Sequence, residues 1–150
     1  MSDPLVRLES VTRSNVRDIC ALRVAPHQEI FVSSNAESLA EAYVVTEAVP
    51  RAVLAGDTLV GFLMLYDEAG QPFVDLWRLM IGADHQGRGF GRSAVLAVVD
   101  YARHRPNTTL VTVGAEEGEG GPAGFYERLG FRRTGELRHG YEIRLELPLA

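Results

Sequence analysis

Apolar and polar residues alternate along the first predicted element of this chain. The alternation runs from Leu5 to Val11 and predicts a β-strand that is buried on one side. A short helix follows, capped by Ser14 and continuing to about Leu22. This part of the chain is therefore expected to form a strand and a short amphipathic helix.

Capping residues predict a second helix. Ser34-Asn35-Ala36-Glu37 matches a capping box, in which Ser34 caps the first turn and Glu37 reaches back to the cap. The helix is expected to continue to about Glu47, and Pro50 is expected to end it because proline cannot continue a helix.

A hairpin and a long strand are predicted for the middle of the chain. Arg51–Leu54 and Leu59–Tyr66 form the hairpin, which turns at Gly56-Asp57. The stretch Phe73–Ile81 is apolar on both faces, which is typical of a central strand. Strict alternation divides its side chains into Phe73, Trp77, Leu79 and Ile81 on one face and Val74, Leu76 and Met80 on the other.

Helices and strands alternate in the second half. A glycine-rich loop, Gly82–Gly91, leads into a helix that ends near Arg103 and carries apolar residues at helical spacing. The remaining predicted elements are a strand at Thr109–Val113, a helix at Pro122–Leu129 ended by Gly130, and strands at Phe131–Glu136 and Tyr141–Leu147. This order predicts a mixed α/β fold, in which antiparallel strands flanked by helices precede a strand-helix-strand-helix-strand segment.

Composition indicates one domain over residues 1–150. Of the 150 residues, 46% are hydrophobic, and the apolar runs are shorter than the roughly 18 residues that cross a bilayer. The N-terminus lacks the order of a signal peptide, and Cys20 has no second cysteine to pair with, so we expect a cytoplasmic protein. The scattered histidines predict no metal site, and the net charge of -5 argues against nucleic acid as the main partner.

The stretch Leu79–Arg92 carries the main candidate chemistry. A central strand leads into a loop where the glycines of Gly87–Gly91 alternate with other residues, and the loop becomes the first turn of a helix. Glycines let backbone N–H groups converge on an anion, and the helix N-terminus adds a partial positive charge. Arg88 and Arg92 can add full charges. The pattern predicts a site for a pyrophosphate.

Other loop types fit this stretch less well. A P-loop requires a lysine, and the chain contains none. Gly89-x-Gly91-x-x-Ala94 fits the dinucleotide pattern but lacks the acidic residue, about 20 positions further on, that holds a ribose. A nicotinamide-dependent oxidoreductase is therefore a weaker interpretation. A tight turn without a ligand stays open as an alternative.

The loop also resembles a known family signature. It reads Gln86-Gly87-Arg88-Gly89-Phe90-Gly91, which resembles the Q/R-x-x-G-x-G/A motif of the GCN5-related N-acetyltransferases (GNAT superfamily). The preceding strand and Phe125–Phe131 fit the family in order and spacing. Together, Leu76–Ile81 and Ser34–Tyr43 look like its bacterial spermine/spermidine acetyltransferase branch. The resemblance implies an α/β fold with a mixed, mostly antiparallel sheet of about six or seven strands, flanked by helices and splayed after the central strand.

The resemblance also implies a role for each part of the site. Amides of the glycine-rich loop would bind the pyrophosphate of acetyl-coenzyme A, the main chain of the strand before it would pair with the pantetheine arm, and Tyr126 would protonate the departing sulfur without a metal. The alternative for Tyr126 is a core aromatic residue. The implied cofactor-binding residues are Leu79, Met80, Ile81, Gln86, Gly87, Arg88, Gly89, Phe90, Gly91 and Arg92.

One position departs from the family pattern. Members often carry an asparagine seven positions before the tyrosine, and here that position is Glu119, in the acidic and glycine-rich segment Glu116–Gly121. Side-chain contacts to the cofactor at this point therefore stay open. The carboxylates of the segment either form a solvated loop or receive a proton from the acceptor.

Acidic residues indicate the class of acceptor. Glu37 and Glu41 lie at i and i+4 of a predicted helix, where two carboxylates repel unless a cation lies beside them. Glu29 and Asp75 can extend an acidic path, although Asp75, on a buried strand, can instead pair with Arg78 or Arg51. We predict a polyamine or another small polycationic amine as substrate. Amino acids, antibiotics and protein N-termini are the alternatives.

Two further hypotheses concern a function without catalysis and the oligomeric state. A non-catalytic acetyl-coenzyme A sensor is the alternative from another functional class, and the place of Tyr126 favours an enzyme over it. Family members are often dimers, and the terminal strands can pair across a two-fold axis, so a homodimer is expected.

Overall fold

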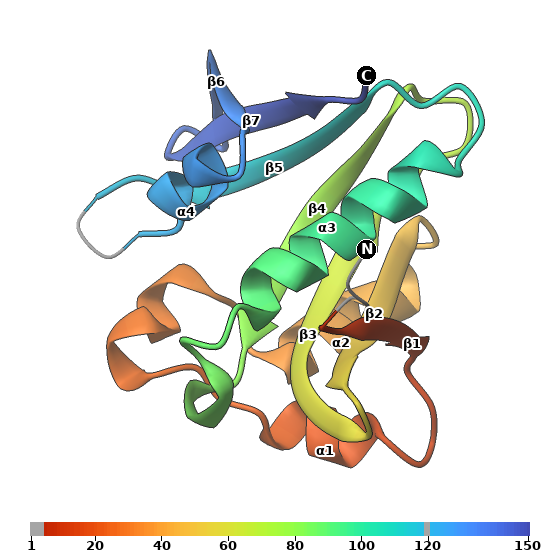
Figure 1. The fold of residues 1–150 in the computed structure, drawn as a ribbon, viewed down its shortest axis with the longest axis vertical. Helices are drawn as coiled ribbons and strands as arrows, with labels where there is room; N and C mark the ends of the chain where they lie inside the picture. Colours follow the sequence, from red (N-terminus) through yellow and green to blue (C-terminus); the bar gives the residue numbers. More distant parts are fainter. Residues whose placement is uncertain (1–4, 119–120) are drawn as a thin grey trace.

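The computed structural model describes residues 5–118 and 121–150 (Figure 1). Within these ranges, seven strands form one sheet in the order β1-β2-β3-β4-β5-β7-β6. The strands are β1 (Arg7–Ser10), β2 (Ala48–Ala55), β3 (Thr58–Tyr66), β4 (Phe73–Ile81), β5 (Leu110–Glu116), β6 (Arg132–Arg138) and β7 (Glu142–Pro148). The helices are α1 (Val16–Ala21), α2 (Asn35–Val44), α3 (Phe90–Arg103) and α4 (Ala123–Arg128), with the short 3-10 helices η1 (Pro26–Phe31) and η2 (Ala83–His85).

The centre of the sheet is forked. Every neighbouring pair of strands is antiparallel except β4 and β5, which run parallel. Residues Phe73–Leu76 of β4 pair with Leu110–Val113 of β5. Beyond these residues β4 continues to Ile81 and β5 to Glu116, but the two strands are no longer paired. The predicted class of fold and the predicted splay after the central strand are thus confirmed.

A β-bulge lies at the base of the fork. On the side facing β3, Leu65 pairs with Leu76 and Met64 pairs with Arg78, so Trp77 is an extra residue in β4. A bulge bends its strand and increases the local twist. Because Leu76 is also the last residue that pairs with β5, the bend occurs where β4 leaves its parallel neighbour.

The bulge corrects the predicted faces of β4. Strict alternation placed Leu79 with Trp77 and Met80 with Leu76. In the structure Leu79 packs on the core cluster that contains Leu76, and Met80 belongs to the cluster that contacts Trp77. The extra residue moves every later side chain to the opposite face, as a shift of one residue does in a strand.

Helices cover both faces of the sheet (Figure 1). α3 packs on β4, β1 and β5 through a row of buried residues, whereas α1 packs on β3 and α2 on β2. Two apolar clusters result. One contains the inner side of α3 with Tyr126 and Phe131, and the other surrounds Ile19, Phe62 and Met80.

Several predicted boundaries differ in the structure. Asn15, and not Ser14, is the N-cap residue of α1, whereas Ser34 caps α2 as predicted and accepts a hydrogen bond from the amide of Glu37 at 3.1 Å. Pro50 does not end a helix but lies inside β2. It directly precedes Arg51, the first residue of β2 that pairs with β1, so at Pro50 the strand is an edge strand, the position in a sheet that tolerates proline.

The C-terminal strand is not an edge. β7 lies between β5 and β6, so both of its sides are already paired. The predicted pairing of terminal strands between two copies is therefore wrong for β7, and a homodimer stays a prediction without that interface.

Candidate active site

The fork opens into a cleft of about 1300 Å³. The cleft extends from the N-terminus of α3, along the free part of β4 and the end of β5, to the turn between β6 and β7. It brings together most of the predicted site residues. Those that line it are Leu79, Met80, Ile81, Gln86, Gly87, Gly89, Phe90, Gly91, Arg92, Tyr126, Glu41 and Asp75.

Two of the predicted site residues, and also Glu29 of the expected acidic path, lie outside the cleft. Arg88 is exposed and does not line it, although both of its neighbours in the loop do. Glu37 is exposed on the first turn of α2 and is likewise absent from the lining. A role for either side chain in binding therefore gains no support from the geometry.

The N-terminus of α3 presents amides that have no hydrogen-bond partner among the described residues. Gly89, with a φ of 83°, precedes the helix without a side-chain cap, and the first intrahelical bond runs from the amide of Ser93 to the carbonyl of Gly89 at 3.0 Å. The amides of Phe90, Gly91 and Arg92 thus have no acceptor within the helix. Together with the positive end of the helix dipole, they form a site suited to a phosphate group.

Glycine leaves room at this site for an anion to approach. Gly87 has a φ of 77°, and a Cβ built on it would meet no other atom within 4 Å, so the space beside it is open cleft. A Cβ on Gly91 would stand 3.5 Å from the Phe125 ring. A diphosphate fits this chain's residues because hydrogen-bond donors and space occur together.

The side chain of Gln86 links the glycine-rich loop to the end of β4 and to η1 by hydrogen bonds. Its side-chain amide donates to the carbonyl of Ile81 at 2.9 Å and to Oε1 of Gln28 at 2.8 Å. The same Gln28 oxygen accepts from the amide of Ala25 at 3.1 Å, which ties η1 to the end of β4. Local sequence patterns did not indicate Gln28, because the contact spans 58 residues.

The main chain of β4 beyond the fork is paired on one side. Leu79, Met80 and Ile81 pair with β3, whereas their other side faces the cleft and pairs with no strand of the described residues. Met80 is 6% exposed and its side chain lies in the core, so a ligand in the cleft can contact mainly its backbone. An extended ligand can add itself to such an edge as a further strand.

Tyr126 enters the cleft from α4. Its ring packs edge-on against Phe125 and Phe131, with centroids 5.1 and 5.5 Å away, and the residue is only 5% exposed. Burial, followed by the negative charge of Asp75, raises the pKa of the Tyr126 phenol well above its usual value. A phenol is protonated at neutral pH even with its usual pKa of about 10, and the raised pKa keeps this proton in place while making the group a weaker acid toward a thiolate.

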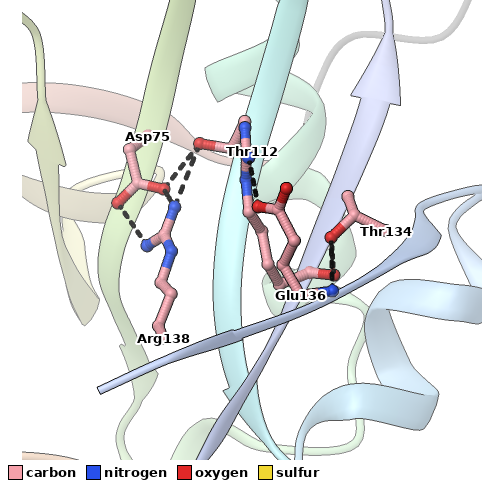
Figure 2. A network of polar contacts seen from close by, with 6 residues as sticks. Asp75, Thr112, Thr134, Glu136 and Arg138 are labelled. Carbon is pink, nitrogen blue, oxygen red and sulfur yellow. Dashed lines mark hydrogen bonds and ion pairs between the residues drawn. The ribbon is translucent and has the colours of Figure 1, made fainter. Parts of the chain in front are cut away.

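Asp75 has a partner that was not predicted (Figure 2). Arg138 binds both oxygens of its carboxylate, and Thr112 donates to one of them at 2.6 Å. The prediction of Arg78 or Arg51 as the partner is wrong, because Arg138 reaches Asp75 across 63 residues of sequence. The carboxylate is thus engaged within the protein.

Glu41 is also neutralised by an arginine. Arg78 lies 3.0 Å from Glu41, donates to Ser38 at 2.9 Å and stands 5.0 Å from the Trp77 ring centre. The expected repulsion between Glu37 and Glu41 is thereby relieved without a polycation. The predicted acidic path through Glu41 and Asp75 therefore consists of carboxylates that are already paired.

Two other carboxylates line the cleft. Glu116 at the end of β5 and Glu142 at the start of β7 are directly opposite each other in the sheet, and neither forms an ion pair within the described part of the chain. Glu117 instead contacts Arg133, and Glu119 lies outside the described residues. The pattern Thr112-x-Gly114-x-Glu116 was the available signal, since alternation places these three residues on one face.

Neither a candidate membrane-spanning helix nor a candidate metal-binding cluster occurs in the described ranges. No helix in 5–118 or 121–150 is both long and apolar enough to span a membrane. In the same ranges, no group of three histidine, cysteine or acidic side chains is arranged to hold a metal ion.

Comparisons with known proteins identify the family of this chain. A model described as the acetyltransferase (GNAT) family matches residues 13–131. The chain belongs to this family. N-acetyltransferase 8 of Rattus norvegicus is 32% identical over 78 residues, which are 51% of this chain and 35% of the rat protein, so the match covers about a third of that relative's length.

Solved structures share the fold over nearly the whole chain. Spermidine N-acetyltransferase from Vibrio cholerae, in complex with CoA and spermine, has a TM-score of 0.74 and 18% identity, and the match covers 97% of this chain and 96% of that one. A GNAT family acetyltransferase from Elizabethkingia anophelis, with acetyl-CoA bound, has a TM-score of 0.67 and 16% identity, covering 98% of this chain and 100% of the other.

Proposed function

We propose that this chain is an acetyl-coenzyme A-dependent N-acetyltransferase that transfers an acetyl group to a primary amine. One observation carries the proposal: the free amides of α3, the unpaired edge of β4 and the protonated phenol of Tyr126 all face one cleft. Membership of the acetyltransferase family and fold neighbours solved with CoA or acetyl-CoA support it.

The first step is capture of the acetyl donor. The amides of Phe90, Gly91 and Arg92 bind the pyrophosphate, and the side chain of Arg92, which lines the cleft, adds a positive charge. The free main chain of Leu79–Ile81 pairs with the pantetheine arm, which lays the thioester along the fork. No residue of this scheme requires a metal.

The second step is attack by the amine. An alkyl amine reacts only when neutral, and its pKa in solution is about 10.4, so the cleft must desolvate it or accept its proton. Negative charge develops on the carbonyl oxygen, and a backbone N–H of Met80 or Ile81 stabilises it by about 2.7–4 kcal/mol. Tyr126 then donates its proton to the departing thiolate.

A polyamine is the acceptor that we propose. The V. cholerae neighbour, which shares the fold, was solved with spermine bound. In this chain Glu116 and Glu142 are the cleft carboxylates without an ion-pair partner among the described residues, and they replace the paired Glu41 and Asp75 as binding groups for an ammonium. Like charges directly opposite in a sheet are unfavourable. Arg138, opposite Glu142 on the other side of β7, offsets part of this repulsion, and a bound cation beside Glu116 offsets more of it.

A panel of amines tests the proposal. The protein is incubated with acetyl-coenzyme A and spermidine, spermine, amino acids, aminoglycosides or N-terminal peptides, and release of free coenzyme A thiol is followed. The proposal predicts turnover with at least one amine and the highest kcat/KM with a polyamine. Turnover of another class alone would remove the polyamine assignment, and turnover of none with saturable acetyl-coenzyme A binding would favour the sensor.

A further inference from the structure

The Asp75–Arg138 ion pair joins two strands that are not neighbours in the sheet. β5 and β7 lie between β4 and β6, yet the terminal nitrogens of Arg138 contact both oxygens of Asp75, with Nη1 3.1 Å from Oδ2 (Figure 2). Thr112 of β5 contributes a third hydrogen bond, and the side chain of Asp75 is 8% exposed. Substitution of only one residue of such a buried ion pair lowers the stability of the fold, because the remaining charge is buried without a partner.

Arg138 reaches Asp75 by lying across Gly114. A Cβ built on Gly114 would stand 3.0 Å from Cδ of Arg138 and 2.8 Å from Oε2 of Glu142. Gly114 is the first residue of β5 after the last one that pairs with β4. Glycine is therefore required here for space, and the arginine fills that space at the base of the fork.

Arg138 is also the first residue of a tight turn. The amide of Tyr141 donates to the carbonyl of Arg138 at 3.1 Å, and His139 and Gly140 have φ values of 51° and 79°. Two successive residues with positive φ are typical of the turns that join hairpin strands. His139 and Tyr141 both line the cleft, so the turn forms part of its surface.

These residues occupy one side of the cleft. Asp75, Glu116 and Glu142 alternate with Leu76, Ala115 and Ile143, which lie in the core cluster that contains α3. Alternation therefore places the three acidic side chains on the face of the sheet opposite α3. We call this face, with Arg138 and the 139–141 turn, the acceptor wall.

We propose that Arg138 is a positioning residue for the acceptor amine. Its ion pair with Asp75, laid across Gly114, fixes the 139–141 turn against the acceptor wall and holds that turn where the amine enters. The inference rests on the proposed function, because it assigns this face to the acceptor. It also explains why a cleft that takes a cation contains an arginine, since Asp75 neutralises its charge locally.

Kinetics and hydrogen exchange of the full chain test the role of Arg138. The variants are Arg138→Gln, Arg138→Lys, Asp75→Asn and the double variant with Asp75→Asn and Arg138→Gln. The control is Arg144→Gln, which removes a 2.9 Å ion pair with Glu136 from the same hairpin but outside the cleft lining. For each variant we compare the KM of the amine, the KM of acetyl-coenzyme A, the melting temperature and amide exchange at 139–142.

The proposal predicts a selective effect. Arg138→Gln raises the amine KM about tenfold, because hydrogen bonds to a charged group are lost, while the acetyl-coenzyme A KM changes less than about twofold. Exchange of the turn amides becomes faster. Arg138→Lys recovers part of the amine KM, and Arg144→Gln changes none of these quantities. The double variant regains melting temperature, since no buried charge is left alone, but keeps the raised amine KM.

Three results would overturn the proposal. They are unchanged exchange at 139–142 in Arg138→Gln, a parallel rise of both KM values, or recovery of the amine KM together with the melting temperature in the double variant. If the wild-type chain acetylates no amine at all, the proposed function fails. Hydrogen exchange then still decides whether Arg138 fixes the turn.

Discussion

Leu76 and Val113 are the last residues through which β4 and β5 pair, and beyond them the two strands separate. The bulge at Trp77 follows Leu76 directly, so the bend in β4 and the end of pairing coincide. This relationship creates the fork, frees the edge of β4 and gives Tyr126 access to it. The proposed chemistry depends on that separation more than on any single side chain.

The glycine-rich loop gives the first prediction. Gly87→Ala places a methyl group in the open cleft and weakens acetyl-coenzyme A binding about tenfold, measured by calorimetric titration. Gly70→Ala is the matched control, since Gly70 also has a positive φ and no atom within 4 Å but lies outside the cleft. Both substitutions should cost about 1–2 kcal/mol of stability through backbone strain. Equal binding by the two variants would argue against a diphosphate beside Gly87.

Tyr126 gives the second prediction. Tyr126→Phe keeps the ring contacts with Phe125 and Phe131 but removes the proton donor, so kcat falls about a hundredfold or more while acetyl-coenzyme A affinity is kept. Tyr101→Phe is the control, because this hydroxyl donates to Asp67 and the residue does not line the cleft. It should lower stability and leave turnover unchanged. Full activity of Tyr126→Phe would remove its catalytic role.

Alkaline pH gives the third prediction. Burial, the hydrogen bond to Asp67 and its charge raise the pKa of Tyr101 from 10.0 to about 12, against the opposing charges of Arg51 and Arg105. Because the folded-state pKa exceeds the unfolded one, the neutral phenol stabilises the fold below pH 10, and this contribution is lost as pH rises toward 12.

Denaturant unfolding of Tyr101→Phe measures that contribution. The variant should lose less stability above pH 10 than the wild type, although burial of Tyr126 acts in the same direction and leaves part of the decline. An identical loss in the wild type and the variant would contradict the assignment.

The acceptor wall gives the fourth prediction. Glu116→Gln removes a carboxylate without an ion-pair partner in the described residues and should raise the KM for spermidine about tenfold, with little effect on the KM for acetyl-coenzyme A. Glu37→Gln is the control, since Glu37 is exposed and outside the cleft. Steady-state kinetics with both substrates varied separates the two KM values. A larger effect from Glu37→Gln would point to the helix α2 as the binding surface.

The sequence predicted those parts of the site that depend on local pattern. β4 has the predicted bounds, Phe73–Ile81, because its apolar run is bounded by turn residues. α3 begins and ends within a residue or two of the prediction, since Gly89 and the buried row through Ala102 define it locally. The left-handed Gly130 after α4 likewise follows from local capping rules.

Contacts between segments that are distant in the chain could not be predicted from the sequence patterns. The bulge at Trp77 depends on the register with β3, and alternation alone cannot reveal it. The partner of Asp75 was predicted wrongly because Arg138 lies on β6, which is separated from β4 by two strands of the sheet. Only the folded structure shows that the arginine side chain reaches across them. Gln28 and Glu142 were not predicted as site residues for the same reason. Each lies on an element that only the fold brings to the cleft.

A crystal structure of the complex with acetyl-coenzyme A is the decisive test of the proposed binding mode. We expect the diphosphate within hydrogen-bond distance of the amides of Phe90, Gly91 and Arg92, and the thioester in the fork beside Tyr126. A nucleotide bound elsewhere, or a fork closed by pairing of β4 with β5 beyond Leu76 and Val113, would contradict it.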